Sequence, residues 1–304
     1  MYYLKRLLFL FPVLLVISFL TFALLRIAPG GPFDRERAPA SEEIRRMQEA
    51  KYHLDKPFLV QYGIYVRDLF GGDLGPSTQY RDHSINDIVA SALPVSLTLG
   101  LLAFCFAQGI GIPLGFYTAV KRGQWGDYIG SFIALLAFCI PSLVIGPLLI
   151  MIFALKLGWL PPALWETPVH VILPTIALGL YYGGRVARLL REGMTEVLKQ
   201  PFIIAARAKG LSETKLLWKH ALRLGILPVV SYSGPMLADV LVGSFVIESA
   251  FGLPGIGIFV VTSVQNRDYA MTMSLTLLYA VLLLVMNLLV DFLYTVLDPR
   301  VKYE

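Results

Sequence analysis

Long uncharged runs alternate with short charged stretches along this chain. Five runs lack charge entirely, and a sixth is broken only by Asp239: residues 7–25, 88–120, 128–155, 167–184, 269–290 and 224–247. A bilayer core about 30 Å thick is crossed by roughly 20 helical residues. The pattern therefore predicts an all-α integral membrane protein with six transmembrane helices.

The run 88–120 is too long for one span and too short for two, so we expect its first part, before about Pro94, to lie at the membrane interface. Composition supports a membrane protein. Hydrophobic residues make up 56% of the chain, charged residues 15%, and the mean hydropathy is +0.67. Glycine and proline within the runs agree with this, because membrane helices tolerate both.

Lys and Arg in short loops predict the orientation. They occur near both ends of the chain, in the second connection and in the fourth: Lys5, Arg6, Lys121, Arg122, Arg185, Arg188, Arg191, Arg300 and Lys302. Short loops on the other side contain only Lys156 and Arg267. Both termini and the loop 183–225 are therefore expected in the cytoplasm. The same asymmetry accounts for the net charge of +5 without a nucleic-acid partner.

The predicted organisation has four parts. Residues 1–29 form an uncleaved transmembrane anchor, because no small-residue cleavage site follows the first run. Residues 30–93 form an external loop, residues 94–298 a five-helix core that includes the cytoplasmic loop 183–225, and residues 299–304 a cytoplasmic tail. Cys105 and Cys139 lie within predicted spans, so neither a disulfide framework nor a zinc site is indicated.

The external loop contains one predicted helix and one predicted turn. Ser41 is a suitable N-cap for a helix over 41–56, and Pro57 marks its end. The glycine-rich stretch "LFGGDLGPS", residues 69–77, predicts a turn. A passive linker and a docking surface are both compatible with this loop.

Residues 201–225, here named the two-helix segment, carry a more specific pattern. Pro201 suits a helix start, and Phe202, Ala205, Ala206 and Lys209 fall on one face of that helix. Gly210 is placed to end it in the left-handed conformation. Ser212 and Glu213 begin a second helix, on which Leu217, His220, Ala221 and Leu224 share a face. Gly225 and Pro228 close the segment.

Two interpretations of this segment remain open. It could be an amphipathic hairpin at the lipid headgroups. However, a lipid-facing helix would need large apolar residues where Ala205 and Ala206 stand, so a protein partner is favoured.

Motifs along nearly the whole chain resemble those of the permease subunits of binding-protein-dependent ABC importers, in the oligopeptide and dipeptide branch. The segment reads "IAARAKG", with Ile204 where the family pattern has Glu. Further similar stretches follow in matching order: "RIAPGGPFD", "GDLGPS", "SALPVSLTLG", "IPSLVIGPLL", "VIESAFGLPGIG" and "NRDYAMTMSLT".

This resemblance implies a type I ABC importer fold in the bacterial cytoplasmic (inner) membrane. It also implies a homologous second permease, two cytoplasmic ATPase subunits and an external peptide-binding protein as partners. In the family the cytoplasmic loop couples to the ATPase, and by that analogy the coupling residues would be Ala205, Ala206, Arg207, Lys209, Gly210, Leu211 and His220. ATP and Mg²⁺ would be bound by the ATPase partners, and this chain would bind no cofactor.

Two further regions are candidates for the transport path. Asp239 is the only acidic residue near the middle of a predicted span, where a charge is costly unless it faces a wet cavity or a partner. It could face the pore or make a structural pair. Glu248, Gly252, Pro254, Gly255 and Gly257 would form an outer gate turn. Gly111 and Gly115 make a G-x-x-x-G pattern, a weak signal of helix packing.

Features of an enzyme are absent from the sequence. It has no G-x-x-x-x-G-K-[ST] phosphate loop, and its four histidines, His53, His83, His170 and His220, are scattered. The resemblance to the oligopeptide and dipeptide branch therefore predicts an importer permease for oligopeptides. Dipeptides, nickel, glutathione or another small solute of the same branch is an alternative, and a self-contained channel or an intramembrane enzyme is a more distant one.

Overall fold

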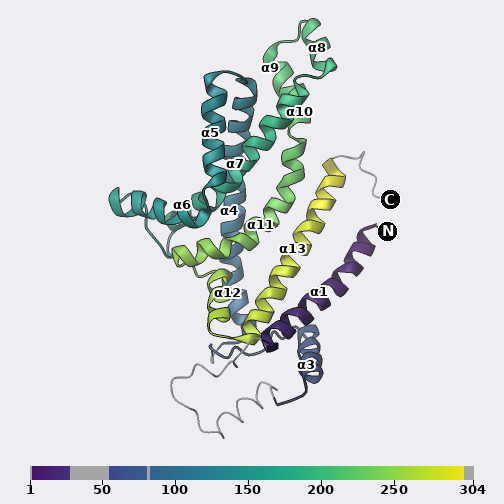
Figure 1. Cartoon of the computed structure of the whole chain (residues 1–304), viewed down its shortest axis with the longest axis vertical. Coiled ribbons are helices and arrows are strands. Elements are labelled where there is room, and N and C mark those ends of the chain that lie inside the picture. The colour runs from purple at the N-terminus through teal and green to yellow at the C-terminus, as the bar shows by residue number, and fades with distance from the viewer. Residues whose placement is uncertain (1, 28–54, 81–82, 298–304) are drawn as a thin grey trace. The chain divides into compact units, whose positions relative to one another are not determined.

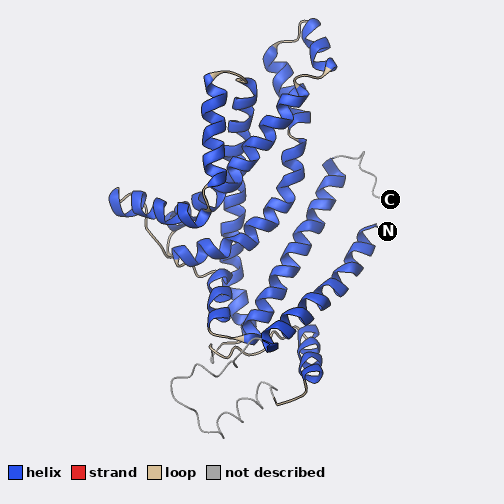
Figure 2. Ribbon diagram, in the orientation of Figure 1, coloured by secondary structure: helices blue, strands red, loops and turns tan. Residues whose placement is uncertain are grey.

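The computed structural model describes residues 2–27, 55–80 and 83–297. All regular elements in these ranges are helical (Figure 2), and an isolated antiparallel bridge joins Pro76 to Ser84. The predicted helix 41–56, apart from its last two residues, and the tail 299–304 lie outside the described residues.

The helices follow one another along the chain as labelled in Figure 1. They are α1 (Tyr2–Ile27), α3 (Phe58–Phe70), α4 (Ile85–Val120), α5 (Trp125–Cys139), α6 (Ser142–Leu149), a π-helical stretch (Ile150–Lys156), a 3-10 turn (Pro168–Val171), α7 (Ile172–Val197), α8 (Pro201–Ala208), α9 (Glu213–Lys215), a second π-helical stretch (Leu216–Ala221), α10 (Leu222–Gly225), α11 (Leu227–Phe251), α12 (Ile256–Gln265) and α13 (Tyr269–Leu297).

Contacts group these helices into two compact units. Unit 1 contains Met1–Val95 and Gly255–Val285, and unit 2 contains Ser96–Pro254 and Met286–Tyr303. The units group residues by contact, whereas the predicted four-part organisation divides the chain by its relation to the membrane. That organisation therefore stays a prediction.

Among residues 2–27, 55–80 and 83–297, three helices are long and apolar enough to cross a membrane: Leu8–Ile27, Ile85–Val120 and Tyr269–Leu289. The number rises to six if each of three bent helix pairs is one span: Trp125–Cys139 with Ser142–Lys156, Glu213–Gly225 with Leu227–Leu241, and Ser244–Phe251 with Ile256–Gln265. The number of candidate spans agrees with the predicted six, but the two sets of segments are not the same. Helix α7, which contains most of the predicted span 167–184, is not among the candidate spans, because its second half carries three arginines and two glutamates.

Two predicted spans take a different form in the structure. The run 128–155 is bent by 101° between α5 and α6. Pro141 causes this break, because a residue before proline avoids the helical conformation, and Ile140 is extended at φ −84° and ψ 121°. By contrast, α4 continues through Pro94 as one helix of 36 residues, about 54 Å long at 1.5 Å per residue.

Unit 1 joins the start of α13 to the glycine-rich turn. Asp268, only 1% exposed, precedes α13 and accepts a hydrogen bond from the backbone N–H of Met271 at 3.2 Å. Its carboxylate also accepts the Ser77 hydroxyl at 2.5 Å, and Ser274 donates to the carbonyl of Leu74 at 3.0 Å. The predicted turn at 69–77 is therefore fixed to the helix that follows Asp268.

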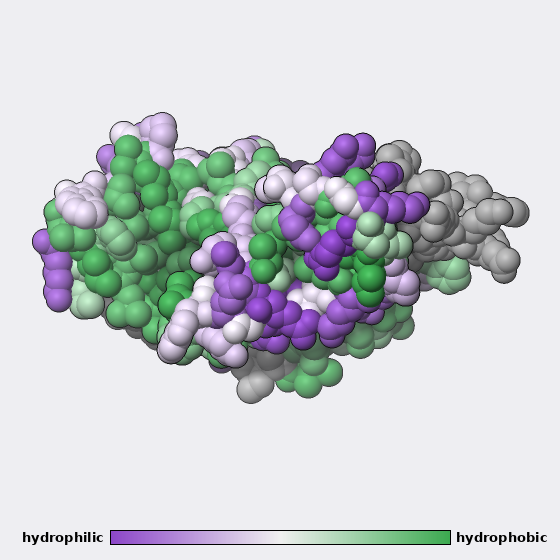
Figure 3. All heavy atoms as spheres, turned by 90° about the horizontal axis from the view of Figure 1, so that it is seen from above, coloured by the Kyte–Doolittle hydropathy of each residue, from purple (hydrophilic) through white to green (hydrophobic). Residues whose placement is uncertain are grey.

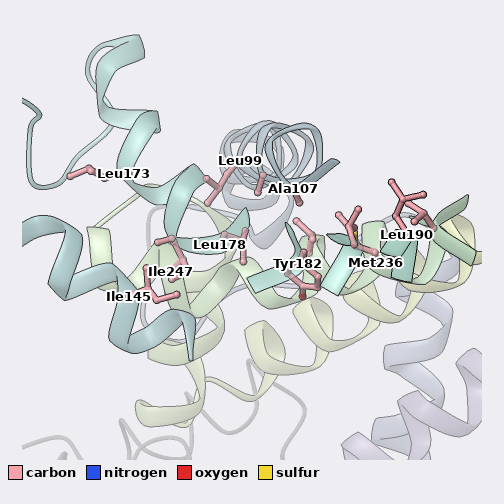
Figure 4. Packing of buried hydrophobic residues seen from close by; sticks show 14 of the residues in the cluster. Leu99, Ala107, Ile145, Leu173, Leu178, Tyr182, Leu190, Met236 and Ile247 are labelled. Atoms are coloured by element: carbon pink, nitrogen blue, oxygen red, sulfur yellow. The ribbon is translucent and has the colours of Figure 1, made fainter. Parts of the chain in front are cut away.

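Unit 2 has its hydrophobic core along α7. Leu178, Tyr182 and Leu190 of α7 belong to one buried cluster with residues of α4, α6 and α11, as Figure 4 shows. Thirteen residues of α7 are buried. This helix is therefore the central element of the unit.

Helix α4 contacts α7 where glycine allows a close approach. A Cβ added to Gly111 would lie 2.6 Å from the carbonyl oxygen of Gly183 and 2.7 Å from Cβ of Val186. One added to Gly115 would meet the carbonyl oxygen of Ala187. The G-x-x-x-G pattern thus packs against α7, as small residues do at helix contacts within membranes.

Replacing Gly111 with valine should destabilise unit 2. The added side chain has no space against α7, and overpacking typically costs about 1–3 kcal/mol. Thermal unfolding of the purified protein in detergent measures the effect. Gly109→Val is the matched control, since nothing lies within 4 Å of a Cβ added at Gly109. Equal melting temperatures for the two variants would contradict the packing.

Candidate functional site

The two-helix segment has the local structure that its sequence predicts. Pro201 occupies the first turn of α8, and Lys209 caps the C-terminal end of the helix. Gly210 follows in the left-handed conformation at φ +78°. Ser212 then precedes α9 with extended backbone angles, although its side chain makes no capping hydrogen bond. The segment is therefore two short helices joined by a glycine-dependent turn.

Buried side chains hold the segment to the rest of unit 2. Ile203, Leu216 and Ala221 are fully buried in the main core cluster. The indole ring of Trp218 lies 4.7 Å from the ring of Phe116 in α4, centroid to centroid. These contacts come from both helices, so the segment is packed against the body of the unit.

The residues predicted to share one face of α8 differ in how exposed they are to solvent. Phe202, Ala205 and Lys209 are exposed, and so is Gly210. Ala206, by contrast, is half-buried and packs against the core together with Leu211. Ile203 and Ala206 therefore lie toward the side of α8 that meets the core, and the coupling role expected of Ala205 and Ala206 stays a prediction. His220, in the π-helical stretch, is also half-buried.

An ion pair closes the turn between the two helices. The Arg207 guanidinium donates from Nε to Oε1 of Glu213 at 2.6 Å and from Nη2 to Oε2 at 3.1 Å. Both side chains are more than half exposed, so the pair sets geometry more than stability. The hydrogen bonds to Glu213 also raise the pKa of Arg207.

A second Arg–carboxylate pair is buried where α5 meets α7. Arg191 donates from Nε to Oδ1 of Asp127 at 2.6 Å and from Nη2 to Oδ2 at 2.9 Å. The Ser131 hydroxyl and the backbone N–H of Gly123 donate to the same carboxylate. The Asp127 side chain is 5% exposed and that of Arg191 32%. This network ties the turn before α5 to α7, and α7 leads directly into the two-helix segment.

Figure 3 shows the molecule from the end at which α8 lies. Hydrophilic surface is grouped there, and broad hydrophobic surface lies beside it. Large apolar side chains of α5 are exposed, among them Ile129, Phe132 and Ile133. A hydrophilic end next to apolar flanks is the pattern expected of a segment that leaves the bilayer.

The predicted outer gate turn contains a helix end in unit 2 and a helix start in unit 1. Glu248 is fully buried in α11 and accepts a hydrogen bond from the Ser244 hydroxyl at 2.6 Å. Gly252 ends α11 in the left-handed conformation at φ +60°, and Leu253 N–H donates to the carbonyl of Glu248 at 2.9 Å. Pro254 is exposed, Gly255 is the N-cap of α12, and Gly257 is buried within α12.

Asp239 lies on the exposed side of α11. Within the described residues its carboxylate makes no ion pair and accepts no hydrogen bond. A structural pair is therefore not formed among these residues, and the orientation of Asp239 toward the pore stays a prediction.

More than half of the chain matches a known protein family. Residues 111–303 match the family described as "Binding-protein-dependent transport system inner membrane component". This chain belongs to that family of permease subunits. It is therefore a multi-pass inner-membrane transport protein rather than an enzyme, and such a system includes separate partner proteins.

Curated relatives match almost end to end. The oligopeptide transport system permease protein OppB of Haemophilus influenzae is 44% identical over 98% of both chains. OppB of Salmonella typhimurium is 43% identical over 99% of this permease and 98% of its own length. The dipeptide transport system permease protein DppB of Bacillus subtilis is 42% identical, with 99% and 97% covered. The permease therefore belongs to the OppB/DppB branch.

Solved structures share the fold. A methionine ABC transporter, MetNI, in an inward-facing conformation has a TM-score of 0.59 at 18% identity, covering 69% of this chain and 96% of its own. An amino acid ABC transporter crystallised with histidines has a TM-score of 0.53 at 20% identity, with 68% and 93% covered. These likenesses support the type I importer fold predicted from the sequence.

Sequence reasoning missed the partners of two arginines. Glu213 was recognised only as a helix start, although its separation from Arg207 spans a single glycine turn. Asp127 directly precedes the uncharged run 128–155, and Arg191 lies 64 residues away. A local pattern cannot connect such distant residues. The only available signal was an acidic residue at the start of an otherwise apolar helix.

Replacing Asp127 with alanine should lower the stability of unit 2 by about 1–3 kcal/mol, because Arg191 would lose the hydrogen-bonding partner of a largely buried pair. Thermal unfolding in detergent measures this loss. Glu213→Ala removes an exposed pair with the same two-bond geometry and should leave the melting temperature almost unchanged. A similar loss in both variants would contradict the structural role assigned to burial.

Proposed function

We propose that this permease carries oligopeptides across the inner membrane after an external peptide-binding protein delivers them. The observation that supports this proposal most strongly is identity of 42–44% over nearly the full chain to proteins named as oligopeptide and dipeptide permeases. Transport would proceed by alternating access, since a continuously open path wide enough for a peptide would also conduct ions.

The proposed assembly contains a homologous second permease and two cytoplasmic ATPase subunits. ATP and Mg²⁺ would be bound by these ATPases, and this chain would carry no cofactor. Both termini and the loop 183–225 would face the cytoplasm, as the distribution of Lys and Arg indicates. The anchor 1–29, the external loop 30–93 and the core 94–298 would be arranged accordingly.

The two-helix segment is proposed to receive the movement of an ATPase. Its outward surface, formed by Phe202, Ala205, Lys209 and Gly210, combines one aromatic anchor with small residues that permit close approach. Arg207 and Lys209 would lie at the polar rim. The anchored side, with Ile203 and Ala206, would pass that movement to α7 and α10.

The outer turn is proposed to shape a gate on the opposite side. Glu248 is buried and hydrogen-bonded at the end of α11, and Gly252 reverses the chain there. Asp239 is proposed to face the path of the passenger, because no ion-pair partner among the described residues offsets its charge.

A dipeptide importer is the second candidate, because the B. subtilis relative carries that name at nearly the same identity. Nickel or another small solute of the same branch would use the same architecture. The family assignment disfavours a self-contained channel or an intramembrane enzyme.

Reconstitution tests the proposed function. The permease, assembled with its partners in lipid vesicles, should take up labelled peptide only when ATP and loaded binding protein are both present. The binding protein should also stimulate ATP hydrolysis. Conduction or peptide cleavage by this chain alone would overturn the proposal, as would uptake of a non-peptide solute in preference to peptides.

A change of Gly210 to aspartate should uncouple ATP hydrolysis from uptake. Gly210 has φ +78°, where other residues are strained by about 1–2 kcal/mol, and nothing lies within 4 Å of an added Cβ. The variant should therefore reach the membrane and support hydrolysis, whereas uptake per complex should fall about tenfold, a usual size for coupling between sites.

Gly158→Asp is the matched control, because Gly158 also has a positive φ, +64°, and open surroundings but lies outside the two-helix segment. It should retain coupled uptake. Normal uptake in Gly210→Asp, or an equal loss in both variants, would show that the turn has no coupling role.

A further inference from the structure

Unit 2 carries two charged side chains, Arg185 on α7 and Asp239 on α11, that neither its core nor the two-helix segment explains. We name this group the polar strip and define it as these two residues with Tyr181 and Tyr182 of α7 and Tyr232 of α11; Tyr182 belongs to the core cluster, and the other two tyrosines pack against it. The two helices pack against each other. The strip therefore belongs to one packed surface.

The cationic end of the strip is held in place by an aromatic ring. The Arg185 guanidinium carbon lies 4.5 Å from the centroid of the Tyr232 ring, a cation–π geometry. Arg185 is exposed, and within the described residues no carboxylate pairs with it. A planar guanidinium fixed by stacking keeps its N–H donors available for a carboxylate or a carbonyl oxygen.

The anionic end is Asp239, which is exposed and likewise unpaired within the described residues. Tyrosines lie on the same two helices as these charges. The rings of Tyr181 and Tyr182 meet edge to face at 5.1 Å. The strip thus presents a carboxylate, aromatic faces and a guanidinium in one region.

Such a strip needs a polar environment. Asp239 lies near the middle of a predicted span, and Arg185 directly follows the uncharged run 167–184. A charge at the depth of Asp239 is costly against lipid and is expected to face a wet cavity or a partner of opposite charge, whereas Arg185 lies at the end of its span. Two opposite charges that do not pair with each other indicate a ligand that carries both.

We propose that the polar strip binds the two charged ends of a peptide in transit, with Asp239 contacting the terminal ammonium and Arg185 the terminal carboxylate. This inference rests on the proposed function and deepens it. Free termini are common to peptides of any sequence, whereas side chains vary. Tyrosine rings add apolar contact without demanding a particular side chain. The strip would therefore contact peptides without selecting their sequence.

The test compares each variant with the native permease on matched peptides in the reconstituted complex. One peptide has free termini, a second is N-acetylated, and a third is C-amidated, each delivered on saturating binding protein. Dividing the variant rate by the native rate for the same peptide removes the preference of the binding protein.

Asp239→Asn should lower uptake of the free peptide about three- to tenfold, the range between exposed and partly desolvated ion pairs, and should change uptake of the acetylated peptide little. Arg185→Gln should show the same selectivity between free and amidated peptides. Asp68→Asn and Arg67→Gln are matched controls on α3, outside the strip, and should treat all three peptides alike.

Asp239→Glu keeps the charge and should retain the native preference, so the inference stays testable if Asp239→Asn fails to assemble. An equal loss for free and blocked peptides in Asp239→Asn or Asp239→Glu would overturn it and indicate a pair with the second permease. No loss in Asp239→Asn or Arg185→Gln would also overturn it. Absence of any peptide uptake by the native complex would instead refute the proposed function.

Discussion

Neighbouring helices approach α7 closely at several glycines, which have no side chain to keep the backbones apart. Gly111 of α4 lies against Gly183, and Gly184 of α7 lies against the backbone of α5 at Ala134. Lipid tails are as apolar as leucine, so burial from water does not drive helices together within a bilayer. Van der Waals packing between closely approaching backbones then becomes a main source of attraction between helices, and the arrangement of unit 2 depends on it.

The same constraint places the two-helix segment. Gly193, near the end of α7, lies against the carbonyl oxygen of Gly225, and a Cβ on Gly225 would come 2.8 Å from the sulfur of Met194. The chain therefore leaves α7 and returns at α10 at nearly the same place. A movement of α8 would reach α7 and α11 together, because both ends of the segment meet at this contact. This geometry suits the proposed coupling role better than a loop with separated ends would.

Local rules predicted much of the segment, and long-range packing decided the rest. Pro201 and Gly210 act through their own backbone angles, so their roles follow from the sequence alone. The burial of Ala206 depends on which side of α8 meets the core, and an alanine pair does not reveal that side. Uncharged length located the apolar segments, but it could not show that Pro141 bends one of them or that α7 is amphipathic.

Three arrangements of charged side chains in unit 2 differ in burial and pairing. These differences help to distinguish charges that stabilise the fold from charges that could bind a ligand. Asp127 and Arg191 are paired and largely buried, so their charges are satisfied within the chain. Arg207 and Glu213 are paired and exposed to water, so breaking and re-forming this pair costs little free energy. Asp239 and Arg185 are exposed without an ion pair within the described residues, and Asp239 lies near the middle of a predicted span, where lipid cannot solvate a charge. Because the charge of Asp239 at that depth has to be satisfied by water, a partner or a passenger, the polar strip is where we propose that the passenger binds.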